Sequence, residues 1–177
     1  MNIFGTKKYI IHHSVTSRDD TTPEYIDKIG REKGYDEGSL GYATAYHYVV
    51  EGDGKITQTR EEDEWVKHCQ DDDNNDNSVA ICVTGNFELK DSETEEEHAK
   101  RWGPPHPTEE QINSLWSIID PLYNDFEGHG QLPNEATLCP GNQLQPIVDK
   151  KKEEMKKERK KWKNFFVRII YFIKNLI

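Results

Sequence analysis

Two short runs of β-forming residues restrict the fold of this chain more than any other feature. Lys8–His12 reads KYIIH, and Ser78–Val83 reads SVAICV. Both are apolar, short and bounded by polar or turn residues, which is typical of buried strands. Helical patterns lie between and after them, at Pro23–Lys33 and from Thr108 to about Tyr123. We therefore predict an α/β fold with a mixed central β-sheet flanked by helices.

A hairpin is predicted between the two buried runs. Tyr46–Glu51 and Lys55–Thr59 read as strands, with Gly52–Gly54 as the tight turn that joins them. In contrast, Asp71–Asp76 and Asp91–Glu97 are rich in acidic residues, and we expect them to be solvated loops without a function.

Charge divides the chain into two parts. The 177 residues carry a net charge of −10, yet residues 150–177 alone hold 11 basic and 3 acidic residues, a net charge of +8 against −18 for residues 1–149. We therefore predict a catalytic or binding domain over 1–149 and a basic amphipathic C-terminal helix over 150–177. An acidic body repels phosphate backbones, which argues against nucleic acid as a partner.

The C-terminal helix combines its cations with an apolar face. Its apolar residues recur at helical spacing, but the stretch is too short and too interrupted by Arg168 and Lys174 to span a bilayer. We expect an interfacial helix that contacts an anionic membrane. Packing on the body or pairing with a second chain are the alternatives. The apolar positions are Trp162, Phe165, Phe166, Ile169, Ile170, Ile173, Leu176 and Ile177.

Cysteine usage and the N-terminus predict where the protein is made. Cys69, Cys82 and Cys139 are odd in number and widely spaced, so they do not form a disulfide framework. The opening segment MNIFGTKKYIIHHS lacks the design of a signal peptide. We therefore expect synthesis in a reducing cytoplasm, where a thiol is more often a ligand or a bystander than half of a disulfide.

A few residues concentrate the chemistry. His12 and His13 end the first buried run, and Gly128-His129 stands ten residues before Cys139 in the segment TLCPG. Two imidazoles and a thiolate suit Zn²⁺, and three protein ligands would leave a fourth position for water, as in catalytic sites. The spacing alone leaves open that these are packed or surface residues.

Four segments favour the zinc site over the alternative of packed or surface residues. IIHHSVT, AYHYVVEGDGKI, VKHCQDDDNNDNSVAICVTGNF and GHGQLPNEATLCPG occur in an order that resembles the type 2 N-acetylmuramoyl-L-alanine amidase family. That family includes amidase-type phage lysozymes and animal peptidoglycan recognition proteins. The resemblance covers roughly residues 7–145, and its most specific part is the last segment.

The resemblance implies a role for each matched residue. His12, His129 and Cys139 would be the zinc ligands, with Tyr46 and Thr137 as catalytic donors beside the metal.

The resemblance implies less about three further residues, His68, His13 and Cys82. The resemblance places the segment of His68 along the substrate groove. Adjacent residues rarely bind one ion, so we expect a groove or structural role for His68 and not a second metal site with Cys69. His13 is expected outside the ligand set, behind it or exposed to the groove, because adjacent strand residues point to opposite faces. Cys82 stands where another branch of the family carries a glutamate base, so we expect it to be a small buried side chain.

By this resemblance, the function would be zinc-dependent hydrolysis of the lactyl-amide bond between N-acetylmuramic acid and L-alanine in peptidoglycan. A phage-type endolysin that reaches the cell wall after release fits better than a recycling amidase, whose branch carries the missing glutamate. The alternatives are a peptidoglycan-binding module without catalysis and a regulator that binds another protein.

Overall fold

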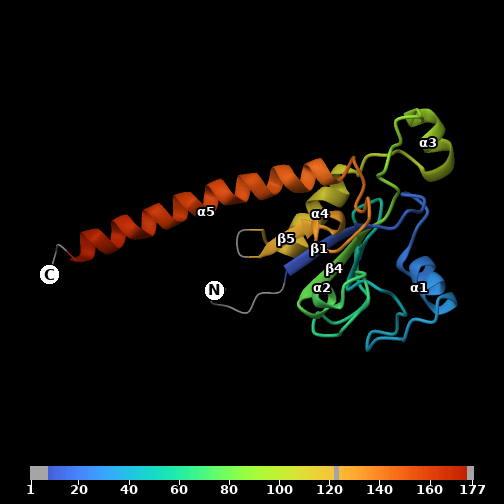
Figure 1. Ribbon diagram of the computed structural model, residues 1–177, viewed down its shortest axis with the longest axis horizontal. Helices are drawn as coiled ribbons and strands as arrows, with labels where there is room; N and C mark the ends of the chain where they lie inside the picture. Colours follow the sequence, from blue (N-terminus) through green and yellow to red (C-terminus); the bar gives the residue numbers. More distant parts are fainter. Residues whose placement is uncertain (1–7, 122–123, 175–177) are drawn as a thin grey trace.

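A single five-stranded sheet forms the centre of the molecule in the computed structural model, which describes residues 8–121 and 124–174, with side chains as far as Phe165 (Figure 1). The strand order is β3-β2-β4-β1-β5. β1 runs parallel to β4 and β5, β2 runs parallel to β4, and β3 pairs with β2 in the antiparallel sense. The predicted mixed sheet is therefore confirmed. The strands are β1 (Lys8–His13), β2 (Tyr48–Val50), β3 (Ile56–Gln58), β4 (Ser78–Val83) and β5 (Asp125–Gly128).

Helices flank this sheet, as the sequence predicts. Two of them, α1 and α4, lie where the sequence places helices, although α4 ends earlier than expected because Asp120 adopts a left-handed conformation at its end. The end of the predicted second helix at Tyr123 lies outside the described residues. The helices are α1 (Pro23–Glu32), α2 (Asp72–Asp76), α3 (Glu95–Trp102), α4 (Glu109–Ile119), the 3₁₀ helix η1 (His129–Gln131) and α5 (Gln145–Lys174).

β1 directs alternate side chains into different layers, as a strand must. Ile11 is fully buried in the main core with Leu115 of α4 and Val148 of α5. Burying an aliphatic side chain of this size stabilises the fold by about 1.5–3 kcal/mol. Ile10 belongs to a separate buried cluster. His12 has the same parity as Ile10, so its imidazole lies on the face of the sheet opposite α4 and α5.

The expectation of solvated loops at Asp71–Asp76 and Asp91–Glu97 is wrong for part of each segment. Asp71 caps α2, which spans the next five residues. Thr94 begins α3 with a capping box, in which Thr94 and Glu97 exchange hydrogen bonds between side chain and backbone. Acidic residues favour the first turn of a helix because they face its positive dipole end. The acidic residues of these segments therefore lie at the starts of two helices.

α5 is docked on the body over its first half. Val148 is fully buried in the core, and the Lys152 ammonium donates to the Glu127 carboxylate of β5 at 2.5 Å. Near the midpoint of α5, the Arg159 guanidinium donates to the backbone carbonyl of Pro121 at 2.8 Å. The part of α5 up to Arg159 therefore packs as part of the domain, and only the rest of the helix forms a tail.

Beyond these contacts α5 extends away from the body (Figure 1). Trp162 and Phe165 are 49% and 51% exposed there. The predicted domain boundary at residue 150 lies inside this helix, which begins at Gln145. None of the helices in the described residues is long and apolar enough to cross a membrane. The remaining predicted apolar positions lie outside the described side chains: Phe166, Ile169, Ile170, Ile173, Leu176 and Ile177.

Candidate metal centre

The carboxyl ends of parallel strands meet at one edge of the sheet. β1 ends with His12 and His13, and β5 ends at Gly128, directly before His129. Because Ile11 of β1 pairs with Gly128 of β5, the two strands bring His12 and His129 together. In open α/β sheets this edge is where ligands usually bind.

The three predicted ligands converge at this edge. Ligand atoms of His12, His129 and Cys139 all lie within 4.8 Å of one another. Sγ of Cys139 is 3.7 Å from Nδ1 of His12, and the centroids of the two imidazole rings are 4.4 Å apart. Two nitrogens and one sulfur at such separations are a donor set that suits tetrahedral zinc.

A close backbone contact holds Cys139 in this position. The Gly130 amide donates to the Cys139 carbonyl at 2.6 Å. A Cβ on Gly130 would lie 2.5 Å from the backbone oxygen of Thr137, so a larger residue would push this segment away. Burial raises the pKa of the Cys139 thiol to about 12, and the His13 amide, 3.4 Å from Sγ, opposes that effect by donating to the sulfur.

A hydrogen-bond chain behind His12 fixes its tautomer. The Ser78 hydroxyl gives its only proton to the Asn74 carbonyl, so its oxygen accepts from Nε2 of His68 at 2.9 Å. Burial lowers the pKa of His68 to about 3, so this ring is neutral and its Nδ1 is an acceptor. That Nδ1 is 3.0 Å from Nε2 of His12. His12 therefore carries its proton on Nε2, and its Nδ1 lone pair faces Cys139.

His68 thus lies behind His12 and supports that ring by a hydrogen bond. Nδ1 of His68 is also 3.2 Å from the sulfur of Cys69, so His12, His68 and Cys69 form a second group of potential ligands. Burial raises the pKa of the Cys69 thiol to about 12, which keeps it protonated. The N–H of His12 and the S–H of Cys69 can both point at the His68 lone pair, which accounts for this cluster by hydrogen bonding.

The two predicted donors flank the ligands. The ring centroid of Tyr46 is 5.4 Å from that of His12. Burial, and then the neighbouring thiols of Cys82 and Cys139, raise the pKa of Tyr46 well above its ordinary value, so the phenol keeps its proton. The Thr137 hydroxyl accepts from the Cys139 amide at 3.2 Å and retains its own proton for donation. Both groups are therefore hydrogen-bond donors beside the cluster.

A hollow of about 460 Å³ opens beside the ligands. His13, Thr137 and Cys139 line one wall, and Arg101 and Trp102 at the end of α3 line another. Burial, and then His129, lower the pKa of His13 to about 4. His13 therefore faces the hollow as a neutral ring outside the ligand set.

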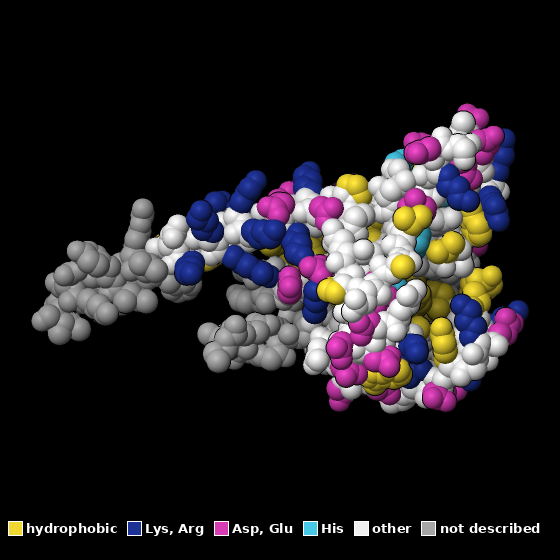
Figure 2. Space-filling model, in the orientation of Figure 1, with side chains coloured by type: hydrophobic (Ala, Val, Ile, Leu, Met, Phe, Trp, Pro, Cys, Tyr) yellow, Lys and Arg dark blue, Asp and Glu magenta, His cyan; other side chains and the backbone are white. Residues whose placement is uncertain are grey.

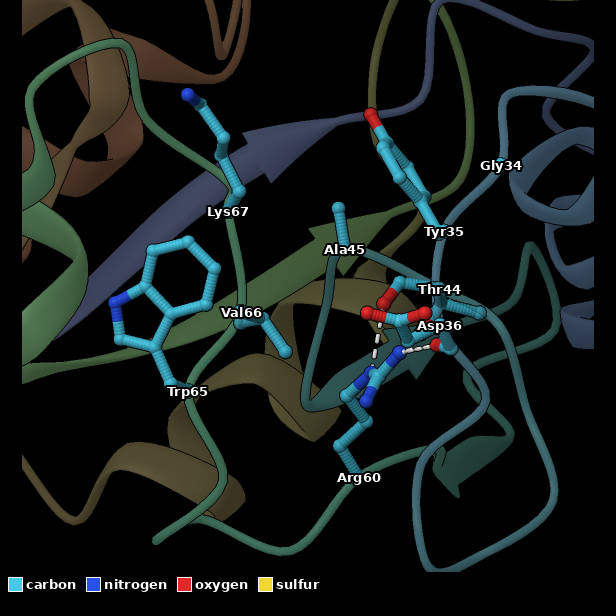
Figure 3. A pocket seen from close by; sticks show the side chains of 9 residues that line it. All are labelled: Gly34, Tyr35, Asp36, Thr44, Ala45, Arg60, Trp65, Val66 and Lys67. Carbon is cyan, nitrogen blue, oxygen red and sulfur yellow. Dashed lines mark hydrogen bonds between the residues drawn. The ribbon is translucent and has the colours of Figure 1, made fainter.

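A smaller hollow has a volume of about 150 Å³, and Figure 3 shows the side chains that line it. The aromatic rings of Tyr35 and Trp65 border it, and the Arg60 guanidinium donates to the Thr44 carbonyl at 2.8 Å. None of the three candidate ligands lines this hollow. It borders the segments that lead into Tyr46 and His68, so it adjoins the candidate centre without containing it.

Glu135 also belongs to the cluster, although the sequence analysis did not single it out. Its side chain is 0% exposed and accepts from Nε2 of His129 at 3.0 Å. It is the only acidic residue of the segment GHGQLPNEATLCPG, which carries His129 and Cys139. That isolation was the one signal available, because no spacing rule links a carboxylate to a histidine six residues earlier.

Comparison with known proteins places this site in a family context. A family model for N-acetylmuramoyl-L-alanine amidase matches residues 5–142. The N-acetylmuramoyl-L-alanine amidase LysC from Clostridium intestinale URNW is 27% identical, with a TM-score of 0.59 over 88% of this chain and 85% of that chain. Bumblebee PGRP-SA is 21% identical, with a TM-score of 0.61 over 83% and 82%. The endolysin of Thermus scotoductus bacteriophage Ph2119 is 19% identical, with a TM-score of 0.56 over 83% and 84%. No curated protein matches the sequence.

Proposed function

The chain belongs to the type 2 N-acetylmuramoyl-L-alanine amidase family, and we propose on that premise that it hydrolyses peptidoglycan with the help of a bound zinc ion. The bond that we assign is the lactyl amide between N-acetylmuramic acid and the L-alanine of the stem peptide. The likeness to an amidase and to a phage endolysin supports a role in degrading the cell wall at lysis.

The convergence of His12, His129 and Cys139 is the observation that carries this proposal. Burial lowers the pKa of His12 well below its ordinary value, so the ring is neutral and able to bind a metal. The Cys139 thiol fits as well, because a divalent cation favours the thiolate that burial alone disfavours. When bound, zinc supplies a Lewis acid that polarises a carbonyl and activates water.

The protein side chains supply hydrogen bonds and position. Tyr46 and Thr137 would donate to the oxygen of the scissile amide as negative charge develops there, and one such donor is typically worth about 3 kcal/mol. Burial raises the pKa of the Cys82 thiol well above its ordinary value, so it stays neutral and does not act as a base. The hollow beside Cys139 gives the substrate access to Thr137, and Tyr46 lines a separate hollow of about 80 Å³.

Zinc content and stem-peptide release from purified peptidoglycan test the proposal together. We expect about one zinc ion per chain, with newly exposed L-alanine amines and intact glycan strands. Cys139→Ala should lose both properties, whereas Cys82→Ala should keep its zinc, because Cys82 is not one of the three ligands. Binding to the wall without release, at full zinc occupancy, would instead support the non-catalytic module. Absence of zinc from the wild-type protein would overturn the metal-dependent mechanism.

We further propose that the distal part of α5 contacts an anionic membrane. Figure 2 shows Lys and Arg side chains along the described part of this helix. Trp162 and Phe165 are half exposed, and their rings meet edge to face with centroids 5.9 Å apart. Cations for lipid headgroups beside aromatics for the acyl boundary are the design of an interfacial helix.

A further inference from the structure

Glu135 is a buried carboxylate that is surrounded by hydrogen-bond donors. Its Oε1 accepts from the Asp71 amide and from Nδ2 of Asn74, each at 3.0 Å. Its Oε2 accepts from the Gln70 amide and from Nε2 of His129, again at 3.0 Å each. A carboxylate that accepts four hydrogen bonds has few free lone pairs with which to bind a metal itself.

This arrangement determines which nitrogen of His129 is available. Each oxygen of Glu135 already faces a backbone amide, which can only donate, so the carboxylate acts as an acceptor and Nε2 of His129 carries the proton. The lone pair of His129 is then on Nδ1, as it is on Nδ1 of His12. A carboxylate behind a metal-binding imidazole fixes the ring, selects the tautomer and increases its basicity as a ligand.

The loop ahead of α2 holds the carboxylate in place. The two consecutive amides of Gln70 and Asp71 point at Glu135. The Asn75 side-chain oxygen accepts from the amides of His68 and Cys69, which secures the start of the same loop. The acidic segment at the start of α2 therefore lies beside the backbone amides that hold the Glu135 carboxylate.

We propose that Glu135 is a positioning residue that holds His129 with Nδ1 directed at the metal. This inference rests on the metal binding assigned under the proposed function. It adds a role for the amides of Gln70 and Asp71, which act on the centre through Glu135. The Cys69, His129 and Glu135 group, whose ligand atoms also lie close together, is then a hydrogen-bonded support for the centre.

Glu135→Gln tests the role of the carboxylate. A glutamine amide carries N–H groups on one side. In the variant these N–H groups would face a pair of residues that are themselves donors, either His129 and Gln70 or Asp71 and Asn74. We expect zinc affinity, measured by competition with a chelator, to fall by about 10- to 100-fold. Nitrogen-15 NMR of the metal-free protein should show His129 protonated on Nε2 in the wild type and a mixture of tautomers in the variant.

Glu64→Gln is the matched control. The Glu64 carboxylate also ties loops together, by accepting from the amides of Ser39 at 2.8 Å and Glu61 at 3.0 Å. It contacts none of the candidate ligands among the described residues. We expect Glu64→Gln to lower the melting temperature without changing the zinc affinity or the His129 tautomer, which separates general destabilisation from ligand positioning.

Asn74→Ala provides a second route if Glu135→Gln does not fold. It keeps the carboxylate but removes one of its donors, and zinc binding should weaken by about fivefold. Unchanged zinc affinity and an unchanged His129 tautomer in the folded variant would overturn the role of Glu135, while zinc binding by the wild type would leave the proposed function standing. A wild-type protein that binds no zinc would overturn the proposed function itself.

Discussion

At the scale of single residues, a substitution at Tyr46 would separate an effect on catalysis from an effect on metal binding. Its phenol lies beside His12 and keeps its proton, but it does not belong to the three ligands. We expect Tyr46→Phe to fold and bind zinc normally while stem-peptide release falls by roughly ten- to a thousand-fold, as for the loss of one oxyanion donor. Tyr48→Phe is the control, because the Tyr48 hydroxyl donates to Glu62 at 2.9 Å. Equal turnover by Tyr46→Phe and wild type would remove Tyr46 from the mechanism.

Thr137 should show a milder version of the same effect. Thr137→Val removes a donor to the substrate and also the acceptor of the Cys139 amide. We expect release to slow by roughly tenfold, the value of one modest hydrogen bond, with zinc affinity little changed. Thr137→Ser keeps the hydroxyl and should restore the rate. A serine variant as slow as the valine variant would show that packing of the threonine methyl matters and that the hydroxyl does not.

The sequence identified residues of the centre only where a local motif was present. His12 ends an apolar strand, and His129 and Cys139 share one segment, so the family resemblance could place all three. Glu135 acts through contacts with residues more than sixty positions away, at Gln70 and Asp71. Such contacts depend on how two loops pack, and no pattern in either loop encodes them.

At the scale of elements, predictability followed the strength of the local signal. β1 and β4 are continuous apolar runs because both faces of each strand are buried, so they were predicted with nearly correct bounds. β5 reads DFEG and was missed, since it forms by pairing with β1 at the edge of the sheet and has little apolar pattern of its own. α2 and α3 were missed because their acidic composition concealed the caps that start them.

Glu127 ties three of these elements together and gives a pH-dependent prediction. From β5 it pairs with Lys8 of β1 and, at 2.5 Å, with Lys152 of α5. Burial raises its pKa, but the hydrogen bonds from both lysines lower it further, to below the ordinary value. The ionised carboxylate therefore stabilises the folded state above the ordinary pKa, and this contribution is lost as the pH falls through the lowered pKa.

We accordingly expect Glu127→Gln to reduce the free energy of unfolding at pH 7 by roughly 1 kcal/mol. Chemical denaturation should show the difference from wild type shrinking as the pH falls below about 4. Glu153→Gln is the control, because Glu153 forms an exposed pair with Lys156 on the same helix and should leave stability unchanged. A difference from wild type that stays constant down to pH 2 would exclude the ion pairs as its cause.

At the scale of the whole molecule, the chain is an acidic body with a basic arm. Residues 1–149 carry −18 and residues 150–177 carry +8, so attraction within the molecule could have folded the arm back. Instead, α5 is held on the body as far as Arg159 and then extends away from it (Figure 1). The opposite charges are thus separated in space, which leaves Lys160, Lys161 and Lys163 exposed to the surroundings and the acidic body to repel anionic surfaces.

A truncation after Lys161 tests what this arm does. It keeps the contacts of Val148, Lys152 and Arg159 with the body, so the melting temperature and hydrolysis of purified peptidoglycan should stay at wild-type values. It removes Trp162, Phe165 and three cations, and a cation near an anionic membrane is worth about 1 kcal/mol. Binding to anionic vesicles should therefore weaken by at least about tenfold, with little change on neutral vesicles. Lysis of whole cells should slow in parallel.

The double variant Trp162→Ala, Phe165→Ala refines this test, because it retains every cation of the arm. If the aromatic rings enter the acyl boundary, it should bind anionic vesicles more weakly than wild type but more tightly than the truncated chain, and the remaining binding should disappear as salt screens the cations. A truncated chain that unfolds, or that loses activity on purified wall, would make the arm a structural element. In that case the body would need its own means of reaching the membrane, against the repulsion of its net negative charge.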